Sequence, residues 1–365
     1  MRVRAFNLET RAPDDVSALQ RLFDAGALRA EDVVCVLGKT EGNGGRNDFT
    51  RALAMSTLEH LFAPRLGCPP SQVQNRVVFS FSGGTEGVVT PHMVVFAREG
   101  ARSEARRPVK RLCVGVGYTR DFAPEEIGRT PQILETARAL TKVIQSLQLD
   151  GPEDVHLVQM KGAIPSYTHE QGVAAARAGA PMRADMVYSR GASALGVGVA
   201  LGEIPRAAIS DDVVCDDWSL YSSVASCSAK PGLARTELLV FANSPYYEGD
   251  LAIHHGTLQD ILDAHGVREA LRGLNLDLGS PPDPAAQDRI VGVFAKSEAD
   301  PRERVRGRRH TMLRDDDIGD TRYSRCVLSS VIASVTGDTR VYVSTRAEHH
   351  GPLGGGPIAI IARVE

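Results

Sequence analysis

The sequence predicts an α/β protein of three structurally similar repeat units related by a pseudo-threefold axis, with sheets that face a central pocket and helices outside. Three apolar, β-branched runs each end on a lysine, which is typical of buried strands that lead into loops. Stretches with helical apolar spacing alternate with these runs, and such alternation favours the α/β class. The three runs are Val33–Lys39, Val155–Lys161 and Ile290–Lys296.

An arginine follows each of these lysines, at the start of an Ala/Leu/Val-rich helical stretch. The spacing from lysine to arginine is the same in the second and third copies and shorter in the first, so we expect a shorter connecting loop there. The three segments are Phe49-Thr50-Arg51, Tyr188-Ser189-Arg190 and Tyr323-Ser324-Arg325.

A third element closes each copy with an apolar run that leads to a serine. The runs are Val77–Ser82, Leu220–Ser226 and Arg340–Ser344, and Ser228 is a close competitor of Ser226. The same order of lysine, arginine and serine in three segments indicates an internal repeat. It predicts units at residues 1–103, 112–247 and 251–365.

Helical spacing outside these elements supports the same architecture. Two basic runs, Arg102–Arg111 and Arg302–His310, are predicted to be solvated connectors, as charge runs usually are. The predicted helices are Asp15–Ala25, Arg51–Phe62, Thr130–Leu147, Gly191–Leu201 and Leu258–Ala264.

Composition limits the function classes. The chain has 365 residues, 42% of them hydrophobic and 24% charged, as in a soluble globular protein. A net charge of −3 and a pI near 6.4 favour neither nucleic acid nor an anionic membrane as partner. The six cysteines form no Cys-x-x-Cys pair, and the first residues do not resemble a signal peptide, so we expect a cytoplasmic protein with reduced thiols.

Gly38-Lys39-Thr40 is not a P-loop, because Val33 stands where that motif needs glycine.

Lysines, arginines and serines that converge on one pocket could support amide hydrolysis. A lysine becomes a base when burial or neighbouring cations lower its pKa, and it can then take the proton of a serine hydroxyl. Arginine offers forked donors to carbonyl oxygens, and glycine-flanked serines let backbone N–H groups approach an oxyanion. A six-membered ring with alternating C=O and N–H groups would match a threefold arrangement of such groups.

Several long motifs resemble the cyanuric acid hydrolase/barbiturase family of ring-opening amidohydrolases. They extend from the first unit to the last, so the resemblance covers nearly the whole chain. They are GKTEGNG (38–44), SGGTEGV (82–88), YTRDFAPEEIGR (118–129), YSRGASALG (188–196), RHTML (309–313) and AEHHGPLGGGP (347–357).

The resemblance implies one active site on the threefold axis and hydrolysis of cyanuric acid to carboxybiuret, which then loses carbon dioxide to give biuret. It implies Lys161 as the base and Ser226 as the nucleophile, with Ser228 left open as the alternative. Lys39 and Lys296 would orient the carbonyls that are not attacked. The other residues implied in substrate binding are Arg51, Ser82, Gly83, Arg190, Cys227, Arg325, Ser344 and Thr345.

The resemblance also implies a structural Mg²⁺ or Ca²⁺ in the third unit, no organic cofactor, and a homo-oligomer, for which the family suggests a tetramer. His350 stands where a glutamine is usual in the family, a change that would not affect a backbone oxygen ligand. The implied metal ligands are Glu298, Ala347, His350, Gly351, Pro352 and Gly355.

Two alternatives remain open from the sequence. Barbituric acid differs from cyanuric acid at one ring position, and Arg322 and Arg325 are the residues expected to distinguish the two substrates. A protein that binds ring metabolites without catalysis would also fit a threefold pocket.

Overall fold

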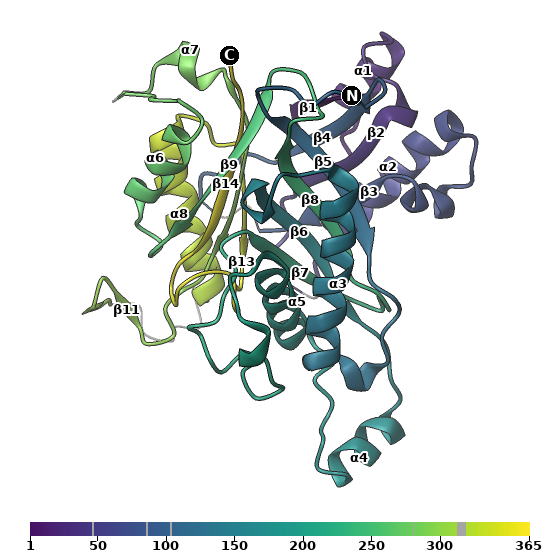
Figure 1. The fold of residues 1–365 in the computed structure, drawn as a ribbon, viewed down its shortest axis with the longest axis vertical. Helices are drawn as coiled ribbons and strands as arrows, with labels where there is room; N and C mark the ends of the chain where they lie inside the picture. The colour runs from purple at the N-terminus through teal and green to yellow at the C-terminus, as the bar shows by residue number, and fades with distance from the viewer. Residues whose placement is uncertain (46, 85–86, 103, 280, 312–318) are drawn as a thin grey trace.

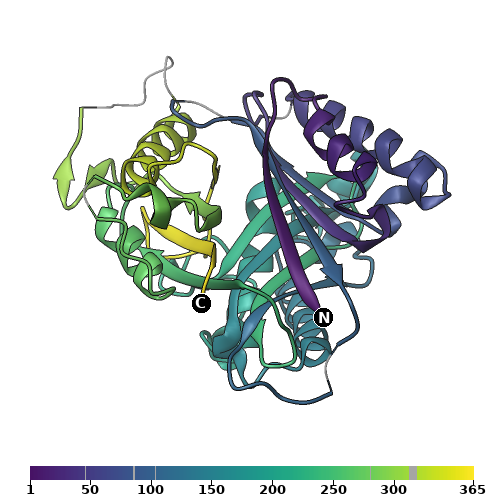
Figure 2. The same ribbon diagram turned by 90° about the horizontal axis from the view of Figure 1, so that it is seen from above.

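A computed structural model of the chain describes residues 1–365 except 46, 85–86, 103, 280 and 312–318. Its described part contains three similar four-stranded mixed sheets. Seen from above, they form three lobes around a common centre, with the helices on the outside (Figure 2). The predicted α/β class and threefold architecture are therefore confirmed. We call the lobes units A, B and C in chain order; their predicted boundaries stay a prediction.

Each unit contributes one four-stranded sheet, with helices between its strands (Figure 1). Unit A has β1 (Arg2–Glu9), α1 (Ser17–Asp24), β2 (Val33–Lys39), α2 (Thr50–Leu66), β3 (Val78–Ser82) and β4 (His92–Glu99). Unit B has β5 (Arg111–Tyr118), α3 (Thr130–Leu147), β6 (Val155–Ile164), α4 (His169–Arg177), α5 (Met186–Leu201), β7 (Ala225–Pro231) and β8 (Glu237–Ser244).

Unit C has β9 (Leu251–Leu258), α6 (Ala264–Arg272), α7 (Pro284–Gln287), β10 (Ile290–Ser297), a small hairpin of β11 (Arg304–Val305) and β12 (Arg308–Arg309), α8 (Asp320–Thr336), β13 (Val341–Thr345) and β14 (Gly356–Arg363). Short 3₁₀ turns complete the chain at Ala30–Asp32, Pro70–Asn75, Pro124–Glu126, Pro152–Asp154 and Arg206–Ala208.

The three sheets share one strand order: β1-β4-β2-β3, β5-β8-β6-β7 and β9-β14-β10-β13. In each sheet the last two strands are parallel and joined by a crossover helix, α2, α5 or α8, as parallel neighbours require. The lysine-bearing strand is always one of this parallel pair. The lysine and the serine at the carboxyl ends of the two strands are therefore delivered to the same edge of the sheet.

Helix α5 shows how the sequence positions an arginine. Its first turn is capped by Asp185, whose carboxylate accepts the Tyr188 N–H at 3.0 Å. The helix is apolar on nearly all sides because it lies between sheet B and α3. At Gly196 a Cβ would lie 2.6 Å from the Ile133 carbonyl oxygen, so glycine permits the close approach of α3 and α5.

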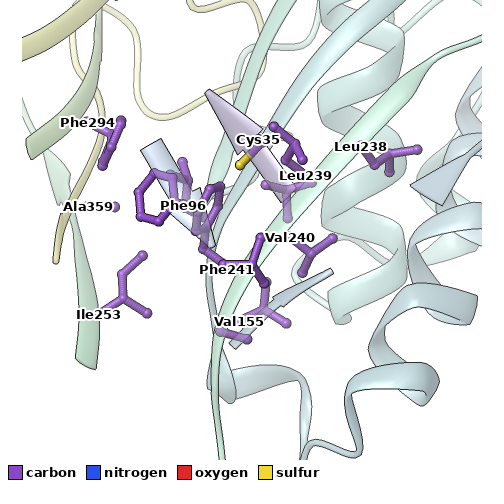
Figure 3. Packing of buried hydrophobic residues seen from close by; sticks show 14 of the residues in the cluster. Cys35, Phe96, Val155, Leu238, Leu239, Val240, Phe241, Ile253, Phe294 and Ala359 are labelled. Atoms are coloured by element: carbon purple, nitrogen blue, oxygen red, sulfur yellow. The ribbon is translucent and has the colours of Figure 1, made fainter. Parts of the chain in front are cut away.

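The centre between the sheets is filled by apolar side chains from all three units. Phe96, Phe241 and Phe294, one from each unit, lie with ring centroids 4.9, 6.2 and 6.3 Å apart (Figure 3). Burial of such rings stabilises the contact between the units. The space around the threefold axis, between the three sheets, is therefore a packed apolar core.

Two predicted elements were wrong. The helix predicted at Leu258–Ala264 is the end of β9 and a loop; α6 begins only at Ala264, where Asp263 caps it by accepting the Gly266 N–H at 2.8 Å. The run Leu220–Ser226 is mostly loop, because β7 begins at Ala225 and continues to Pro231. Among the described residues, no helix combines the length and apolarity needed to cross a bilayer.

Candidate active site

Three lysine–serine pairs stand at the carboxyl ends of the parallel strands. The strand register sets Lys39 beside Ser82, Lys161 beside Ser228 and Lys296 beside Ser344. The corresponding Nζ–Oγ distances are 3.3, 2.8 and 3.4 Å. The shortest contact is thus the one in unit B.

The register distinguishes the two candidate serines by their neighbours on β6. Ser226 is buried and lies beside Gln159, whereas Ser228 is the serine in register with Lys161. The two serines share one face of β7, about 6–7 Å apart along the strand. The apolar pattern of the sequence could not show which of the two serines lies beside Lys161, because the predicted strand begins at Leu220, five residues before β7.

Cys227, which the resemblance implies in substrate binding, is buried. It lies on the opposite face of β7, where a Cβ on Gly162 would meet both its sulfur and the Ser189 hydroxyl of α5. Burial raises the pKa of its thiol, and its backbone N–H donates to His350 Nε2 at 2.9 Å. Ala229 follows Ser228 as Gly83 follows Ser82, and it lines a cavity beside Lys161.

Contacts between units bring the pairs together. Lys39 Nζ donates to the Val343 carbonyl at 2.9 Å, and Val343 precedes Ser344 of unit C. Lys161 Nζ donates to the Phe81 carbonyl at 3.1 Å, and Phe81 precedes Ser82 of unit A. Units A, B and C therefore meet at these strand ends, as the sequence predicted.

The three lysines differ in their hydrogen-bond partners. Lys39 Nζ contacts Ser82 Oγ and the carbonyls of Gly83 and Val343. Lys296 Nζ contacts Ser344 Oγ and the carbonyls of Thr345 and Arg346. Each of these sets offers three acceptors, which matches the three donors of an ammonium group.

Lys161 Nζ makes two such contacts, one with a carbonyl and one with the Ser228 hydroxyl. A neutral amine has two N–H donors and one lone pair, so it can donate to the carbonyl while its lone pair accepts the hydroxyl proton. The contacts of Lys161 therefore suit a neutral amine.

Burial and a neighbouring arginine lower the pKa values of two lysines. Burial, and next the Arg51 guanidinium, lower the pKa of Lys161 to about 7. Burial, and next Arg190, lower the pKa of Lys296 to about 8. In each case the main neighbouring cation is the arginine of the preceding unit.

Arg51, Arg190 and Arg325 lie near the N-terminal ends of α2, α5 and α8. Each of them acts on residues of the next unit. Arg190 of unit B forms a buried two-pronged ion pair with Glu348 of unit C, with N–O distances of 2.8 and 2.7 Å. Arg325 of unit C reaches Asn43 O of unit A at 3.4 Å and Thr345 Oγ1 at 3.5 Å. Arg51 of unit A remains partly exposed and lies 3.5 Å from Asp48.

A cavity of about 180 Å³ lies beside Lys161, between units A and B. Arg51, Lys161, Lys230 and Glu237 supply its charged wall together with Asp48. The remaining lining residues are Gly45, Ala52, Met55, Phe79, Phe81, Met186, Ala229 and Pro231.

Known proteins are similar to this chain over nearly its whole length. A sequence profile of the family described as "Amidohydrolase ring-opening protein" matches residues 4–363. The chain belongs to the ring-opening amidohydrolases. It is 45% identical to a cyanuric acid amidohydrolase of Enterobacter cloacae, with 100% of both chains covered, and 42% identical to a cyclic amide hydrolase of Azorhizobium caulinodans, again with 100% of both covered.

A solved cyanuric acid hydrolase structure superposes with a TM-score of 0.89 at 44% identity and covers 99% of each chain. The resemblance predicted from the motifs is therefore confirmed. This ring-opening amidohydrolase is an enzyme that hydrolyses cyclic amides.

The predicted metal ligands of this amidohydrolase lie after β10 and in the loop before β14. Glu298 is buried, and its carboxylate accepts the Ala347 N–H at 2.7 Å. Pro352 O accepts the Gly355 N–H at 2.9 Å, and Gly351 packs against Gly356. Among the described residues, no group of three His, Cys, Asp or Glu side chains could hold a metal ion.

The ring of His350 is not free to bind a metal. Its Nε2 accepts the Cys227 N–H, and its Nδ1 lies 2.6 Å from the Glu348 carbonyl. Only the backbone oxygen of His350 could serve as the predicted ligand.

The two arginines expected to distinguish the substrates have different surroundings. Arg322 is exposed in the first turn of α8, whereas Arg325, one turn later, is buried. Their role in specificity stays a prediction.

Proposed function

We propose that this enzyme is a cyanuric acid amidohydrolase in which Ser228 is the nucleophile and Lys161 its general base. The observation that carries this proposal is the 2.8 Å contact between Lys161 Nζ and Ser228 Oγ, made by the lysine whose partners suit a neutral amine. Supporting evidence is the full-length similarity to proteins named cyanuric acid amidohydrolase.

The reaction would proceed through an acyl-serine intermediate. Lys161 takes the Ser228 proton while Ser228 Oγ attacks a ring carbonyl carbon, and the tetrahedral intermediate collapses as the C–N bond breaks and Lys161 returns the proton to the ring nitrogen. A water molecule then attacks the acyl carbon, gives a proton to Lys161, and releases the Ser228 oxygen, which takes that proton back. The product, carboxybiuret, loses carbon dioxide to leave biuret.

The other two pairs would bind rather than react. Lys39 and Lys296 have their three donors occupied, so they hold the hydroxyls of Ser82 and Ser344 toward the two remaining carbonyls. Backbone N–H groups beside the serines, including those of Gly83 and Thr345, are suited to stabilise negative charge on a carbonyl oxygen. The nearly threefold substrate would thus be gripped by three similar sets, one of which is reactive.

The test compares initial rates on cyanuric acid and barbituric acid, with biuret formation followed by chromatography. Turnover of cyanuric acid with release of biuret is expected. Preference for barbituric acid would replace the substrate assignment and keep the chemistry. Stoichiometric binding of cyanuric acid without turnover would favour the non-catalytic alternative and overturn the proposal.

For the cation, we infer a structural Mg²⁺ or Ca²⁺ bound by Glu298 and by backbone oxygens of the loop at residues 347–355. The donor set is entirely oxygen, which suits these two ions. Burial, and next Glu348, raise the pKa of Glu298 to about 7, although Arg346 Nη1 lies 3.8 Å from its carboxylate and acts in the opposite direction. A cation there would hold the loop in place.

A cytoplasmic homo-oligomer completes the proposal. All six cysteines are unpaired, which fits a reducing compartment. Phe49 and Leu53 at the start of α2 are 76% and 47% exposed, as expected of apolar side chains that a second copy could cover. Light scattering after gel filtration measures the mass, and a monomer would contradict this inference.

A further inference from the structure

The three lysines have different neighbours on their antiparallel side. Lys39 pairs with His92 of β4, and Lys161 pairs with Glu237 of β8. In unit C, Ala295 pairs with Ile358, so the same register brings Lys296 opposite Pro357. Of the three positions, only the one beside Lys161 is a carboxylate.

Glu237 and Lys161 also line the same cavity between units A and B. Directly opposite residues of an antiparallel pair have Cβ atoms about 5 Å apart on one face of the sheet. Glu237 is partly buried, and its carboxylate takes part in none of the ion pairs within 4.0 Å that the described residues form. It is therefore positioned to act on the Lys161 amine through space.

Several charged or titratable groups surround this pair from neighbouring elements. Arg51 and Asp48 face it from unit A, and Lys230 faces it from β7. Cys227, on the other face of β7, acts on Lys161 only electrostatically. Arg235 acts on Glu237 from the turn before β8. Cations thus outnumber carboxylates around Lys161, and the negative charge of Glu237 partly offsets their repulsion of the Lys161 ammonium.

We propose that Glu237 is a positioning residue of the reaction, whose carboxylate stabilises the Lys161 ammonium that forms when Ser228 gives up its proton. The inference rests on the proposed function of Ser228 and Lys161. Glu237 takes no proton itself: the Ser228 proton goes to Lys161 Nζ and then to the leaving ring nitrogen. The carboxylate thereby has the role that an acidic residue has beside the base in other serine hydrolases.

The electrostatics agree with the geometry. Burial and Arg51 lower the pKa of Lys161, and Glu237 opposes this shift while Lys230 adds to it. The pKa of Glu237 is itself raised, by burial first, with Lys230 and Lys161 acting in the opposite direction. Glu237 and Lys230 therefore act on the base with opposite sign.

The test uses Glu237→Gln and Lys230→Gln as an opposed pair in the full-length enzyme. Activity requires neutral Lys161, so kcat/KM should rise with pH through the pKa of that lysine. Glu237→Gln should shift the rise of kcat/KM on the acidic side of the pH profile, its acidic limb, to lower pH by about 0.5 to 2 pH units, the range for unit charges about 6 Å apart. It should also lower the plateau of kcat/KM above that rise about tenfold or more. Lys230→Gln should move the limb to higher pH, and Glu237→Asp should restore part of the plateau.

A second readout separates this inference from the proposed function. Competitive acetylation of Lys161 by acetic anhydride, followed by peptide mass spectrometry across pH, measures the pKa of its amine without substrate. The same opposite shifts are expected in the two variants. If Glu237→Gln is folded and leaves both the acidic limb and the acetylation pKa unchanged, Glu237 has no such role, even where the wild type opens cyanuric acid.

Discussion

Lys161 Nζ lies 2.8 Å from Ser228 Oγ. Ser226, two residues earlier on the same face of β7, lies instead beside Gln159 of β6. The two serines are similar in chemistry and in sequence context, so their registers distinguish them. A base accepts a proton only from a hydroxyl within hydrogen-bond reach. This relationship gives the most direct test of the proposed nucleophile.

We expect Ser228→Ala to reduce kcat by about 10⁴-fold or more, as loss of a serine nucleophile does in other hydrolases. Ser226→Ala should keep kcat within about tenfold, because its hydroxyl does not reach Lys161. Initial rates on cyanuric acid measure both effects, with far-UV circular dichroism as the control for folding. The reverse ranking would return the assignment to Ser226.

Lys161→Met should abolish turnover and also change how stability depends on pH. Between about pH 7 and the ordinary lysine pKa near 10.5, the unfolded chain holds a proton on this lysine that the folded enzyme lacks. The contribution of Lys161 to the free energy of unfolding therefore rises with pH across that window and is smallest below it.

Urea unfolding of Lys161→Met and wild type at about pH 7 and about pH 9.5 measures this contribution. The difference in stability between wild type and variant should move in favour of the wild type at the higher pH. A difference that is the same at both values would show that Lys161 is not the site of a lowered pKa.

Much of the fold could be predicted because its main elements are local patterns. Thr130–Leu147 was predicted with the bounds that the structure gives α3, since its buried residues Ile133, Ala137, Leu140 and Leu147 recur at helical spacing. The three lysines were likewise marked by the buried strands that they end. Periodicity is informative wherever one side of an element faces the core.

The rest of the site depends on pairing between segments distant in the chain. The choice of Ser228 over Ser226 follows from the register of β7 with β6, and Glu237 reaches Lys161 through the antiparallel pairing of β8. Glu348 likewise pairs with Arg190, which lies far from it in the chain and in another unit. Single-strand patterns carry no information on such partners.

Gly83→Ala should impair the enzyme through Asp48. A Cβ on Gly83 would lie 1.7 Å from Asp48 Oδ2, and this carboxylate accepts the N–H groups of Gly44 and Thr50 and lies near Arg51. Displacing it would move Arg51, and a shift of about 1 Å at a binding group can cost about 100-fold in rate.

Gly172→Ala, in the exposed helix α4, is the matched control, because alanine is favoured there and the site lies outside the cluster. Steady-state kinetics on both variants check the effect. Wild-type kcat/KM in Gly83→Ala would show that Asp48 can move without cost.

Millimolar Ca²⁺ or Mg²⁺ should raise the thermal unfolding temperature of chelator-treated enzyme, because a ligand that binds only the folded state stabilises it. Glu298→Gln should remove that increase, since it removes the one carboxylate of the proposed donor set. Glu104→Gln, on an exposed connector, should keep the increase. An equal response in all three proteins would place the cation elsewhere or leave it unbound.

Glu348→Gln should destabilise the enzyme by about 3–5 kcal/mol, because it leaves the buried Arg190 guanidinium without its counter-charge. Burial alone would raise the pKa of Glu348, but its hydrogen bonds with Arg190 keep that pKa below its ordinary value of 4.5. The pair therefore contributes stability above the ordinary glutamate pKa and loses it as pH falls through the lower folded-state value. Denaturant unfolding across acidic pH should show this loss in wild type and not in Glu348→Gln.

The double variant Arg190→Met/Glu348→Leu distinguishes stability from binding. Replacing both charges with apolar side chains of similar size is often neutral or stabilising, so the double variant should recover most of the lost stability. Its turnover should stay low, because the family resemblance implies Arg190 as one of three arginines that bind substrate. If instead the double variant is as active as wild type, Arg190 serves only to join units B and C, and the threefold set of substrate-binding arginines is reduced to Arg51 and Arg325.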